Sequence, residues 1–494
     1  MADNPLHDLT RPKRFSLADC QEFSRLSGDV NPMHLDAVAA RRLLAGRVVV
    51  HGSNVLLSAL EHIASSVDYA IVGIGCEFSN PVCVGDEVTF RVRSGTVEDR
   101  LSVIVGMQTC ATIRLAKRVA DAEQSEHTML GSAVSELLEP LEQPLSRPPE
   151  EWVGTSARVA LPSANFETAF PETCRWIGVP AIRSIAATSY IVGMVCPGLH
   201  SIASSYRFAL TAELPPPDAL EFTVDRFDSR FHLLEMRLSG SVSGVAKAFV
   251  RPPPVDQPSA RELAKHVRKD EFAGVRSLVV GASRGIGEAT AKLLAAGGSD
   301  IVLTWASGLS DCQRVAADII SSGGRCSIVR FRAGTDNPAD VLRESGPVDH
   351  AYYFPTPSIF RKAAGVFDRA RFDEFIDVYA EPFVALCEAL NKQARVGTVR
   401  IFHPSSTAVT ERPRGVTEYA MAKAAIELLA DDLDRTLPHI TIIGERLPRI
   451  ATDQTATVFN VAAMEAWEAI LPVIRRMYES ESGHPVADVS PDTA

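Results

Sequence analysis

The stretch "FSRLSGDVNPMHLDAVAA", residues 23–40, places an acid, an amide and an imidazole between two apolar segments. Asp29, Asn31 and His34 fall within six positions, interrupted by a glycine and a proline. A carboxylate beside an imidazole can supply both the acid and the base that proton-transfer chemistry needs near neutral pH. The alternative interpretation is an ordinary polar turn between two helices, in which Asp29 caps the second helix.

The next segment, "GRVVVHGSNVLLSAL" at residues 46–60, predicts an apolar helix that starts just after His51. The N–H groups at a helix N-terminus are unpaired and carry partial positive charge. Gly52 allows a close backbone approach to this helix start, and His51 can line the same pocket. This second motif favours an assembled acid–base site over a polar turn.

With 494 residues, the chain is too long for a single hydrophobic core. Two polar, proline-containing segments, 119–152 and 251–270, have the composition of inter-domain linkers. They divide the chain into three predicted domains, 1–118, 153–250 and 271–494.

The first two predicted domains repeat one order of elements, a long helix followed by strands. In the first we expect helices over 16–26, 35–45 and 52–66 and strands over 69–78, 85–93 and 100–116. In the second we expect a helix over 184–197 and strands over 202–210, 219–228, 231–240 and 245–252. The repeated order predicts a duplicated α+β fold in which one helix is wrapped by an antiparallel sheet. The apolar helix of the second domain is short for a membrane span, and we interpret it as buried.

Composition excludes several classes of protein. A net charge of −11 argues against a surface for nucleic acid or an anionic membrane. Nine scattered cysteines without a CxxC pair indicate reduced thiols rather than a disulfide framework or a zinc site, so we expect no metal. The N-terminal residues lack the apolar core of a secretory signal, and a cytoplasmic protein is expected.

Taken together, "SGDVNPMH" and "GRVVVHGSNVLLSAL" resemble the motifs of the MaoC-like (R)-specific enoyl-thioester hydratases and dehydratases. The resemblance implies an α+β double hotdog with a catalytic first half and a degenerate second half that completes the acyl tunnel. It implies that Asp29 and His34 handle one water molecule and that Asn31 supports their loop. It also implies that the Gly52 N–H binds the thioester oxygen, with His51 in the pocket.

The third domain opens on "VRSLVVGASRGIGEATAKLLAAGGSDIVLTW", residues 275–305, which predicts strand, glycine-rich turn, helix and strand. Its glycines let the turn close and the backbone approach a pyrophosphate. The turn residues expected at the cofactor are Gly281, Ser283, Arg284, Gly285, Ile286 and Gly287. No acid follows the second strand to hold a ribose 2′-hydroxyl, whereas Arg284 suits a 2′-phosphate and Ser307 can assist, which favours NADP(H). The alternative for Arg284 is a solvated loop cation.

Further along, "SSTAVTERPRGVTEYAMAKAAIELL" places Ser406 thirteen positions before Tyr419, which stands in YxxxK spacing with Lys423. With the glycine turn, this resembles the short-chain dehydrogenase/reductase (SDR) family over 274–478, with an α/β Rossmann-type, doubly wound parallel sheet. The resemblance implies that Tyr419 transfers a proton and Ser406 binds the substrate carbonyl. It implies that Lys423 lowers the pKa of Tyr419 and holds the nicotinamide ribose, and that Thr452 meets the carboxamide. A simple surface pair of Tyr419 and Lys423 on a helix is the alternative.

Three features depart from the SDR pattern. The usual Asn-Asn-Ala-Gly run is replaced by "DHAYYFPTPSIF" at 349–360. The usual helix asparagine is replaced by Tyr379, and the usual Pro-Gly by Pro448 and Arg449. These changes put the family's asparagine–lysine water relay in doubt. They leave Ser406, Tyr419 and Lys423 in place.

A reductase that makes a 3-hydroxyacyl thioester and a dehydratase that consumes it catalyse consecutive steps. We therefore expect a bifunctional NADPH-dependent ketoreductase–dehydratase of fatty-acid or polyketide biosynthesis. Its substrate would be carried by acyl carrier protein or coenzyme A, and the SDR domain would form a homodimer. Two alternatives stay open: an (R)-enoyl-CoA hydratase/3-hydroxyacyl-CoA dehydrogenase of the β-oxidation type, and a dehydratase with a catalytically silent SDR scaffold.

Overall fold

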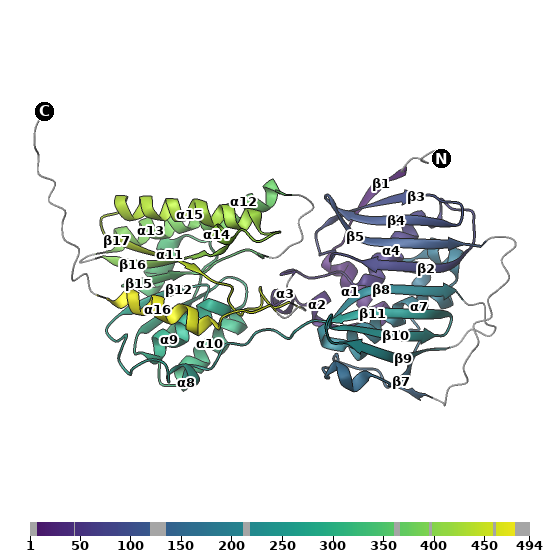
Figure 1. Ribbon diagram of the computed structural model, residues 1–494, viewed down its shortest axis with the longest axis horizontal. Coiled ribbons are helices and arrows are strands. Elements are labelled where there is room, and N and C mark those ends of the chain that lie inside the picture. The colour runs from purple at the N-terminus through teal and green to yellow at the C-terminus, as the bar shows by residue number, and fades with distance from the viewer. Residues whose placement is uncertain are drawn as a thin grey trace, which may run out of the picture. The chain divides into compact units, whose positions relative to one another are not determined.

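The computed structural model describes residues 7–43, 45–118, 135–210, 218–359, 366–394, 398–457 and 461–479 (Figure 1). It forms two compact units. The first contains residues up to Pro254, and the second begins at Val255.

An eleven-stranded sheet with the order β1-β3-β4-β5-β2-β8-β11-β10-β9-β7-β6 forms the first unit. Its strands are β1 (His7–Arg14), β2 (Ile71–Phe78), β3 (Glu87–Arg93), β4 (Glu98–Val105), β5 (Gln108–Lys117), β6 (Glu136–Leu137), β7 (Ser156–Ala160), β8 (Ser201–Leu210), β9 (Ala219–Asp228), β10 (Leu233–Ser239) and β11 (Val242–Val250). Its helices are α1 (Leu17–Ser27), α2 (Pro32–Leu35), α3 (Ala37–Ala40), α4 (Gly52–Ala64), η1 (Pro149–Trp152), α5 (Phe166–Ala169), α6 (Pro171–Ile177), α7 (Val179–Tyr190), η2 (Ile191–Val195) and η3 (Gly198–His200).

Two expected elements of the first unit were wrong in extent. The run 100–116, expected as one strand, is a hairpin of β4 and β5 that turns at Gly106, whose φ of 56° favours glycine. The helix expected over 35–45 is only the four-residue α3, because Asp36 starts a new turn by accepting hydrogen bonds from the N–H groups of Val38 and Ala39. The unpredicted β1 covers the edge strand β3.

The helices α4 and α7 lie against one face of the sheet, and no described helix covers the other face (Figure 1). Both helices contribute buried side chains to a single apolar core, among them Leu56 on α4 and Ile185 on α7. At the centre of the sheet, β2 of the first half pairs with β8 of the second. Among the described residues, no single helix has the length and hydropathy of a membrane span; α6 with α7–η2 passes only as a pair bent by 111°.

Part of each expected linker packs against a unit. In the first linker, β6 pairs with β7, and the Leu145 N–H donates to the Met194 carbonyl at 2.8 Å. In the second, the Val255 N–H donates to Asp453 Oδ1 at 2.8 Å. The Ala260 N–H donates to Asp318 Oδ2 at 3.1 Å, which ties the start of α8 (Ala260–Leu263) to the second unit.

The second unit is built on a six-stranded parallel sheet with the order β14-β13-β12-β15-β16-β17. Its strands are β12 (Arg276–Val280), β13 (Asp300–Trp305), β14 (Arg325–Arg330), β15 (His350–Tyr353), β16 (Val399–Ser406) and β17 (Ile440–Leu447). The helices after α8 are α9 (Gly285–Ala296), α10 (Leu309–Ser321), α11 (Pro338–Ser345), α12 (Arg369–Tyr379), α13 (Glu381–Gln393), α14 (Ala408–Glu411), α15 (Thr417–Thr436) and α16 (Ala466–Tyr478).

Apolar side chains cover both faces of this parallel sheet, as continuous hydrophobic strands predict. On β12, Val279 packs in a cluster with α9 and α16, whereas Leu278 and Val280 pack in a second cluster with α11 and α13. The strand order reverses between β12 and β15, so the carboxyl ends of these two strands open a crevice of the kind that binds dinucleotides.

Candidate active sites

The loop between α1 and α2 shapes the first candidate site. Gly28 ends α1 with a φ of 78°, a conformation that favours glycine. Asn31, and not Asp29, caps α2, because its side-chain oxygen accepts the Met33 N–H at 3.2 Å. The interpretation of Asp29 as a helix cap is therefore wrong, and its carboxylate is left for other contacts.

The Asp29 carboxylate is buried and held by two donors. Its Oδ1 accepts the Asn31 N–H at 3.2 Å, and its Oδ2 accepts the Ser189 hydroxyl at 2.8 Å. Burial raises the pKa of Asp29, opposed by the charge of His34 and by the two hydrogen bonds. A carboxyl group with a raised pKa can carry a proton at neutral pH and act as a general acid.

His34 presents one free ring nitrogen in the same pocket. Its Nδ1 lies 2.7 Å from the Val49 carbonyl oxygen, which can only accept, so Nδ1 carries the proton and Nε2 a lone pair. Burial lowers the pKa of His34, although the Asp29 charge opposes this shift. Burial therefore favours the neutral form of His34, in which Nε2 can accept a proton, and the protonated form of Asp29, which can donate one.

His51 is buried beside His34 and Asp29. Its ring stacks on that of His34 with centroids 3.8 Å apart and an interplanar angle of 23°. Its Nε2 donates to the Asp29 carbonyl at 3.1 Å, and burial lowers its pKa well below the usual value. Ligand atoms of Asp29, His34 and His51 lie within 4.8 Å of one another. His51 Nε2 donates to a carbonyl and so carries a proton instead of a lone pair, whereas His34 Nε2 keeps a lone pair that can accept a proton.

Gly52 begins α4 beside this cluster, as expected. A Cβ at Gly52 would lie 3.1 Å from the Phe78 ring and 3.5 Å from the Ala203 Cβ, so a side chain there would crowd the helix N-terminus. Residues of both halves of the unit thus enclose the N–H groups of the first turn.

The second half contributes contacts that the sequence did not predict. Besides Ser189, it supplies the carbonyls of Gly193 and Gly198, which accept the Asn31 side-chain N–H groups at 2.8 and 3.2 Å. A Cβ at Gly193 would lie 2.4 Å from both carboxylate oxygens of Asp29. Gly193 lies in η2, a π-helical turn that follows α7. In the sequence, these contacts are indicated only by the small residues Ser189 and Gly193 within the apolar segment "SYIVG".

The glycine turn of the second unit has the geometry of a dinucleotide cradle. Gly281 and Gly285 have φ values of 83° and 57°, and a Cβ at Gly287 would lie 2.2 Å from the Gly281 carbonyl oxygen. The turn ends in the N-terminus of α9, whose N–H groups favour a phosphate. Ser283 is buried in the turn, and Ile286 packs against the core. These residues fit a nicotinamide dinucleotide.

The other expected cofactor residues surround this turn. The Thr452 side chain lies beside Gly285, where a Cβ would be 3.4 Å from the Thr452 Cγ2. Ser307 is exposed just after β13. Arg284 is not a freely solvated cation, because its Nη1 lies 3.4 Å from Asp453 Oδ2.

Ser406, Tyr419 and Lys423 come together at the end of β16 and the start of α15. The Ser406 hydroxyl accepts the Ala408 N–H at 3.2 Å and also bonds the Tyr419 hydroxyl. The Lys423 ammonium donates to the Pro404 carbonyl at 2.7 Å, and burial lowers its pKa to about 7. Burial raises the pKa of Tyr419, and only Ser406 opposes the shift. The expected lowering by Lys423 was wrong for this arrangement, because Lys423 Nζ lies 6.0 Å from the Tyr419 ring centroid.

Tyr379 explains where the lysine is held. The ammonium of Lys423 lies 4.0 Å from the Tyr379 ring centroid, a cation–π distance. The Tyr379 hydroxyl bonds the Thr356 hydroxyl at 2.6 Å, and the ring is buried. An aromatic face therefore contacts Lys423 from the position at which the family resemblance leads one to expect an asparagine.

Comparison with known proteins follows the same division of the chain. A family model described as short chain dehydrogenase matches residues 276–463, and one described as MaoC like domain matches residues 6–113. An NADPH-dependent aldehyde reductase-like protein, chloroplastic, of Arabidopsis thaliana is 30% identical over 186 residues, which are 34% of this chain and 68% of the relative. The chain joins a MaoC-like domain to a short-chain dehydrogenase. It belongs to the short-chain dehydrogenase family through its second unit.

Two further relatives each match one domain. An (R)-specific enoyl-CoA hydratase of Aeromonas caviae is 36% identical to the MaoC-like region over 83 residues, 16% of this chain and 62% of the relative. A 3-oxoacyl-[acyl-carrier-protein] reductase of Synechocystis is 41% identical over 66 residues, 13% of this chain and 27% of the relative. A solved dehydrogenase/reductase from Sinorhizobium meliloti 1021 is 24% identical, with a TM-score of 0.39, and covers 42% of this chain and 90% of its own.

Proposed function

We propose that the chain is a bifunctional ketoreductase–dehydratase. The short-chain dehydrogenase unit reduces a 3-ketoacyl thioester with NADPH, and the MaoC-like unit dehydrates the 3-hydroxyacyl product to the trans-2-enoyl thioester. The observation that carries the proposal is the buried pair of Asp29 and His34, in which burial raises the pKa of the carboxyl group and lowers the pKa of the imidazole, in one chain with Ser406, Tyr419 and Lys423. The names of the two matched relatives, a 3-oxoacyl reductase and an enoyl-CoA hydratase, support these substrate classes.

Dehydration needs a base at C2 and an acid at the C3 hydroxyl. In the proposed step, His34 Nε2 accepts the C2 proton, and protonated Asp29 donates to the departing hydroxyl, which leaves as water. The N–H of Gly52 stabilises the charge that develops on the thioester oxygen. The second half, with no acid–base loop of its own, supplies Ser189 and encloses the acyl chain as a second hotdog.

Reduction uses the second unit. NADPH, when bound, supplies the hydride to C3 of the ketoacyl group. Tyr419 donates a proton to the C3 oxygen, and its raised pKa keeps that proton in place until the oxygen becomes basic. Ser406 orients the same oxygen by a hydrogen bond. Lys423 binds the nicotinamide ribose, and Thr452 meets the carboxamide.

Arg284 provides the prediction for cofactor choice. A 2′-phosphate attracts the Arg284 guanidinium and competes with Asp453 for it. Arg284→Ala should therefore raise the Kd for NADPH about tenfold or more and change the Kd for NADH little, as measured by fluorescence titration. Arg268→Ala, an exposed arginine of the same unit, is the control. Equal losses for both cofactors would mean that Arg284 only shapes the turn.

Ser189 provides a prediction for pH dependence. Its hydroxyl favours the ionised form of Asp29, so Ser189→Ala raises the Asp29 pKa further. Dehydration requires protonated Asp29 and is lost as pH rises through that pKa. The high-pH limb of kcat/KM for dehydration should therefore move to higher pH in this variant.

Ser184→Ala is the matched control for that measurement. Ser184 lies on the same helix, is equally buried, and its hydroxyl has no hydrogen-bond partner among the described residues. Its removal should leave the high-pH limb where it is in the wild-type protein. A limb that stays in place in Ser189→Ala, or moves to lower pH, would contradict the acid role of Asp29.

A specific observation supports a second candidate function. The Tyr379 ring on Lys423, in place of a water-supporting asparagine, favours an SDR unit that binds cofactor without turnover. A panel of 3-ketoacyl thioesters of coenzyme A and acyl carrier protein, with NADPH consumption and enoyl formation followed together, distinguishes the two. Consumption of NADPH matched by formation of the enoyl thioester supports the bifunctional enzyme. Binding of NADPH without its consumption on any of these substrates supports an SDR unit that is only a scaffold. Oxidation of 3-hydroxyacyl-CoA in preference to reduction would indicate the reverse, β-oxidation-type direction.

A further inference from the structure

The face of the eleven-stranded sheet opposite α4 and α7 carries a row of arginines that the sequence does not reveal. Arg93 on β3 lies directly opposite Arg100 on β4, and Arg100 lies opposite Arg114 on β5. Arg114 is opposite Gly75 on β2, and Gly75 is opposite Arg207 on β8. Because residues directly opposite each other point to the same face of a sheet, these side chains form one transverse row.

The row continues through the second half of the unit. Arg207 is opposite Val245 on β11, and Val245 is opposite Arg237 on β10. From β3 to β10 the row crosses neighbouring strands spaced about 4.8 Å apart, a length of roughly 29 Å. All of these arginines are exposed except Arg114, which is partly covered.

This alignment is unfavourable for the sheet itself. Like charges directly opposite one another destabilise a β-sheet, and the chain as a whole carries a net charge of −11. Arg114 is paired with Glu77 at 3.4 Å and Arg237 with Asp225 at 2.8 Å. Within the described part of the chain, neither Arg100 nor Arg207 has an acid at ion-pair distance. The positive charge in the row is therefore only partly compensated.

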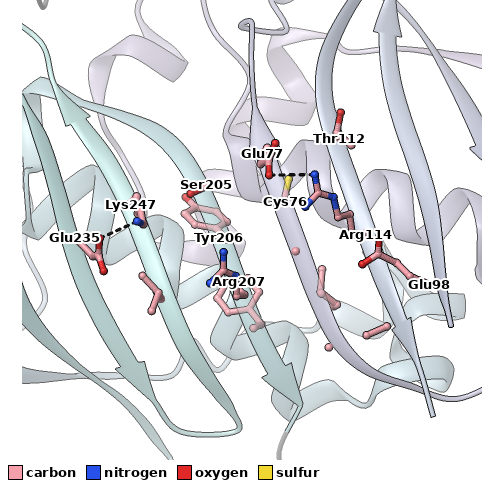
Figure 2. A pocket seen from close by; sticks show the side chains of 16 residues that line it. Cys76, Glu77, Glu98, Thr112, Arg114, Ser205, Tyr206, Arg207, Glu235 and Lys247 are labelled. Carbon is pink, nitrogen blue, oxygen red and sulfur yellow. Dashed lines mark ion pairs between the residues drawn. The ribbon is translucent and has the colours of Figure 1, made fainter. Parts of the chain in front are cut away.

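A shallow hollow lies along the middle of the row. Gly73 and Gly75 leave the outer surface of β2 without side chains, and the resulting pocket has a volume of about 280 Å³. Figure 2 shows Arg207 and Arg114 on the strands to either side of it, with Lys247 and Glu235 farther out. The hollow is lined by three bases, Arg114, Arg207 and Lys247, and by three acids, Glu77, Glu98 and Glu235. Glu77 pairs with Arg114 and Glu235 with Lys247, whereas Arg207 has no acid at ion-pair distance within the described residues.

We infer that this arginine row is the docking surface for an acidic α-helix of a partner protein laid across the strands. A helix with one carboxylate in each turn repeats about every 5.4 Å, close to the strand spacing of about 4.8 Å. Arginine binds carboxylates through paired, charge-assisted hydrogen bonds. A second copy of this chain that meets the first through the same face does not fit, because two arginine rows would face each other. Neither proposed activity is needed for the surface to act.

A double variant, Arg100→Ser with Arg207→Ser, tests the inference in the full chain. The probe is a fluorescein-labelled helical peptide with one glutamate in each turn, and binding is measured by fluorescence anisotropy. The peptide should bind the wild-type protein with an affinity that falls as salt rises, and the double variant should raise its Kd about tenfold or more. Arg175→Ser with Arg369→Ser removes the same charge from exposed positions elsewhere and should leave the Kd unchanged.

Three results would overturn the inference: no binding of the peptide by the wild-type protein, an unchanged Kd in the double variant, or tighter binding of a DNA duplex of equal charge. The last would indicate a nucleic-acid surface. Equilibrium unfolding separates docking from folding. Arg100→Ser removes repulsion from Arg93 and Arg114 on the neighbouring strands, whereas Arg207 faces only Gly75 and Val245. The free energy of unfolding should therefore stay equal or rise; a fall would show that the arginines serve the fold and would also overturn the inference.

Discussion

We expect His34→Ala to abolish dehydration of a supplied 3-hydroxyacyl thioester, with a fall in kcat/KM of about 10²–10⁴-fold, the range of general acid–base catalysis. The physical reason is that His34 Nε2 is the free lone pair of the pocket, since Nδ1 is committed to the Val49 carbonyl. Asp29→Asn should give a loss of similar size, because an amide cannot donate an acidic proton. Formation of the enoyl thioester is the measurement.

The same variants should reduce 3-ketoacyl thioesters at the wild-type rate, because the site of reduction lies in the other unit. His62→Ala is the control, since this histidine packs on Phe90 at the other end of α4 and does not reach the loop of Asp29. A loss below tenfold in both variants would remove Asp29 and His34 from the proposed chemistry.

The second large effect is expected in the other unit, where Tyr419→Phe should eliminate NADPH-dependent reduction of a 3-ketoacyl thioester. Tyr419 is the proposed proton donor, and phenylalanine keeps its packing on Phe375 while it removes the hydroxyl. The expected loss in kcat/KM is about 10²–10⁴-fold. Consumption of NADPH in single-substrate assays measures it, and dehydration should persist.

Tyr352→Phe is the matched control for this experiment. Tyr352 is fully buried on β15, and its hydroxyl has no hydrogen-bond partner in the described part of the chain, so its removal should leave reduction unchanged. If Tyr419→Phe reduces the 3-ketoacyl thioester at the wild-type rate, a group other than Tyr419 donates the proton to the C3 oxygen. If the wild-type protein itself binds NADPH and consumes none, the silent-scaffold alternative replaces the reductase.

The sequence was sufficient for the parts of each site that are close in the chain. The loop with Asp29 and His34, the helix start at Gly52, and the one-turn spacing of Tyr419 and Lys423 were all readable because local backbone geometry places such neighbours together. In the second unit, the strand, glycine-rich turn, helix and strand of residues 275–305 were readable from the pattern, whereas the rest of the parallel sheet was expected only from the family resemblance.

Contacts between residues far apart in the chain were decided only by the tertiary structure. Ser189 reaches Asp29 across 160 positions, and the Tyr379 ring covers Lys423. The pairing of strands that lines up Arg100 with Arg207 is likewise invisible in the sequence, because register depends on every turn and bulge between them. The directions of the pKa shifts belong to the same group: they follow from burial, and burial is a property of the assembled fold rather than of any local motif.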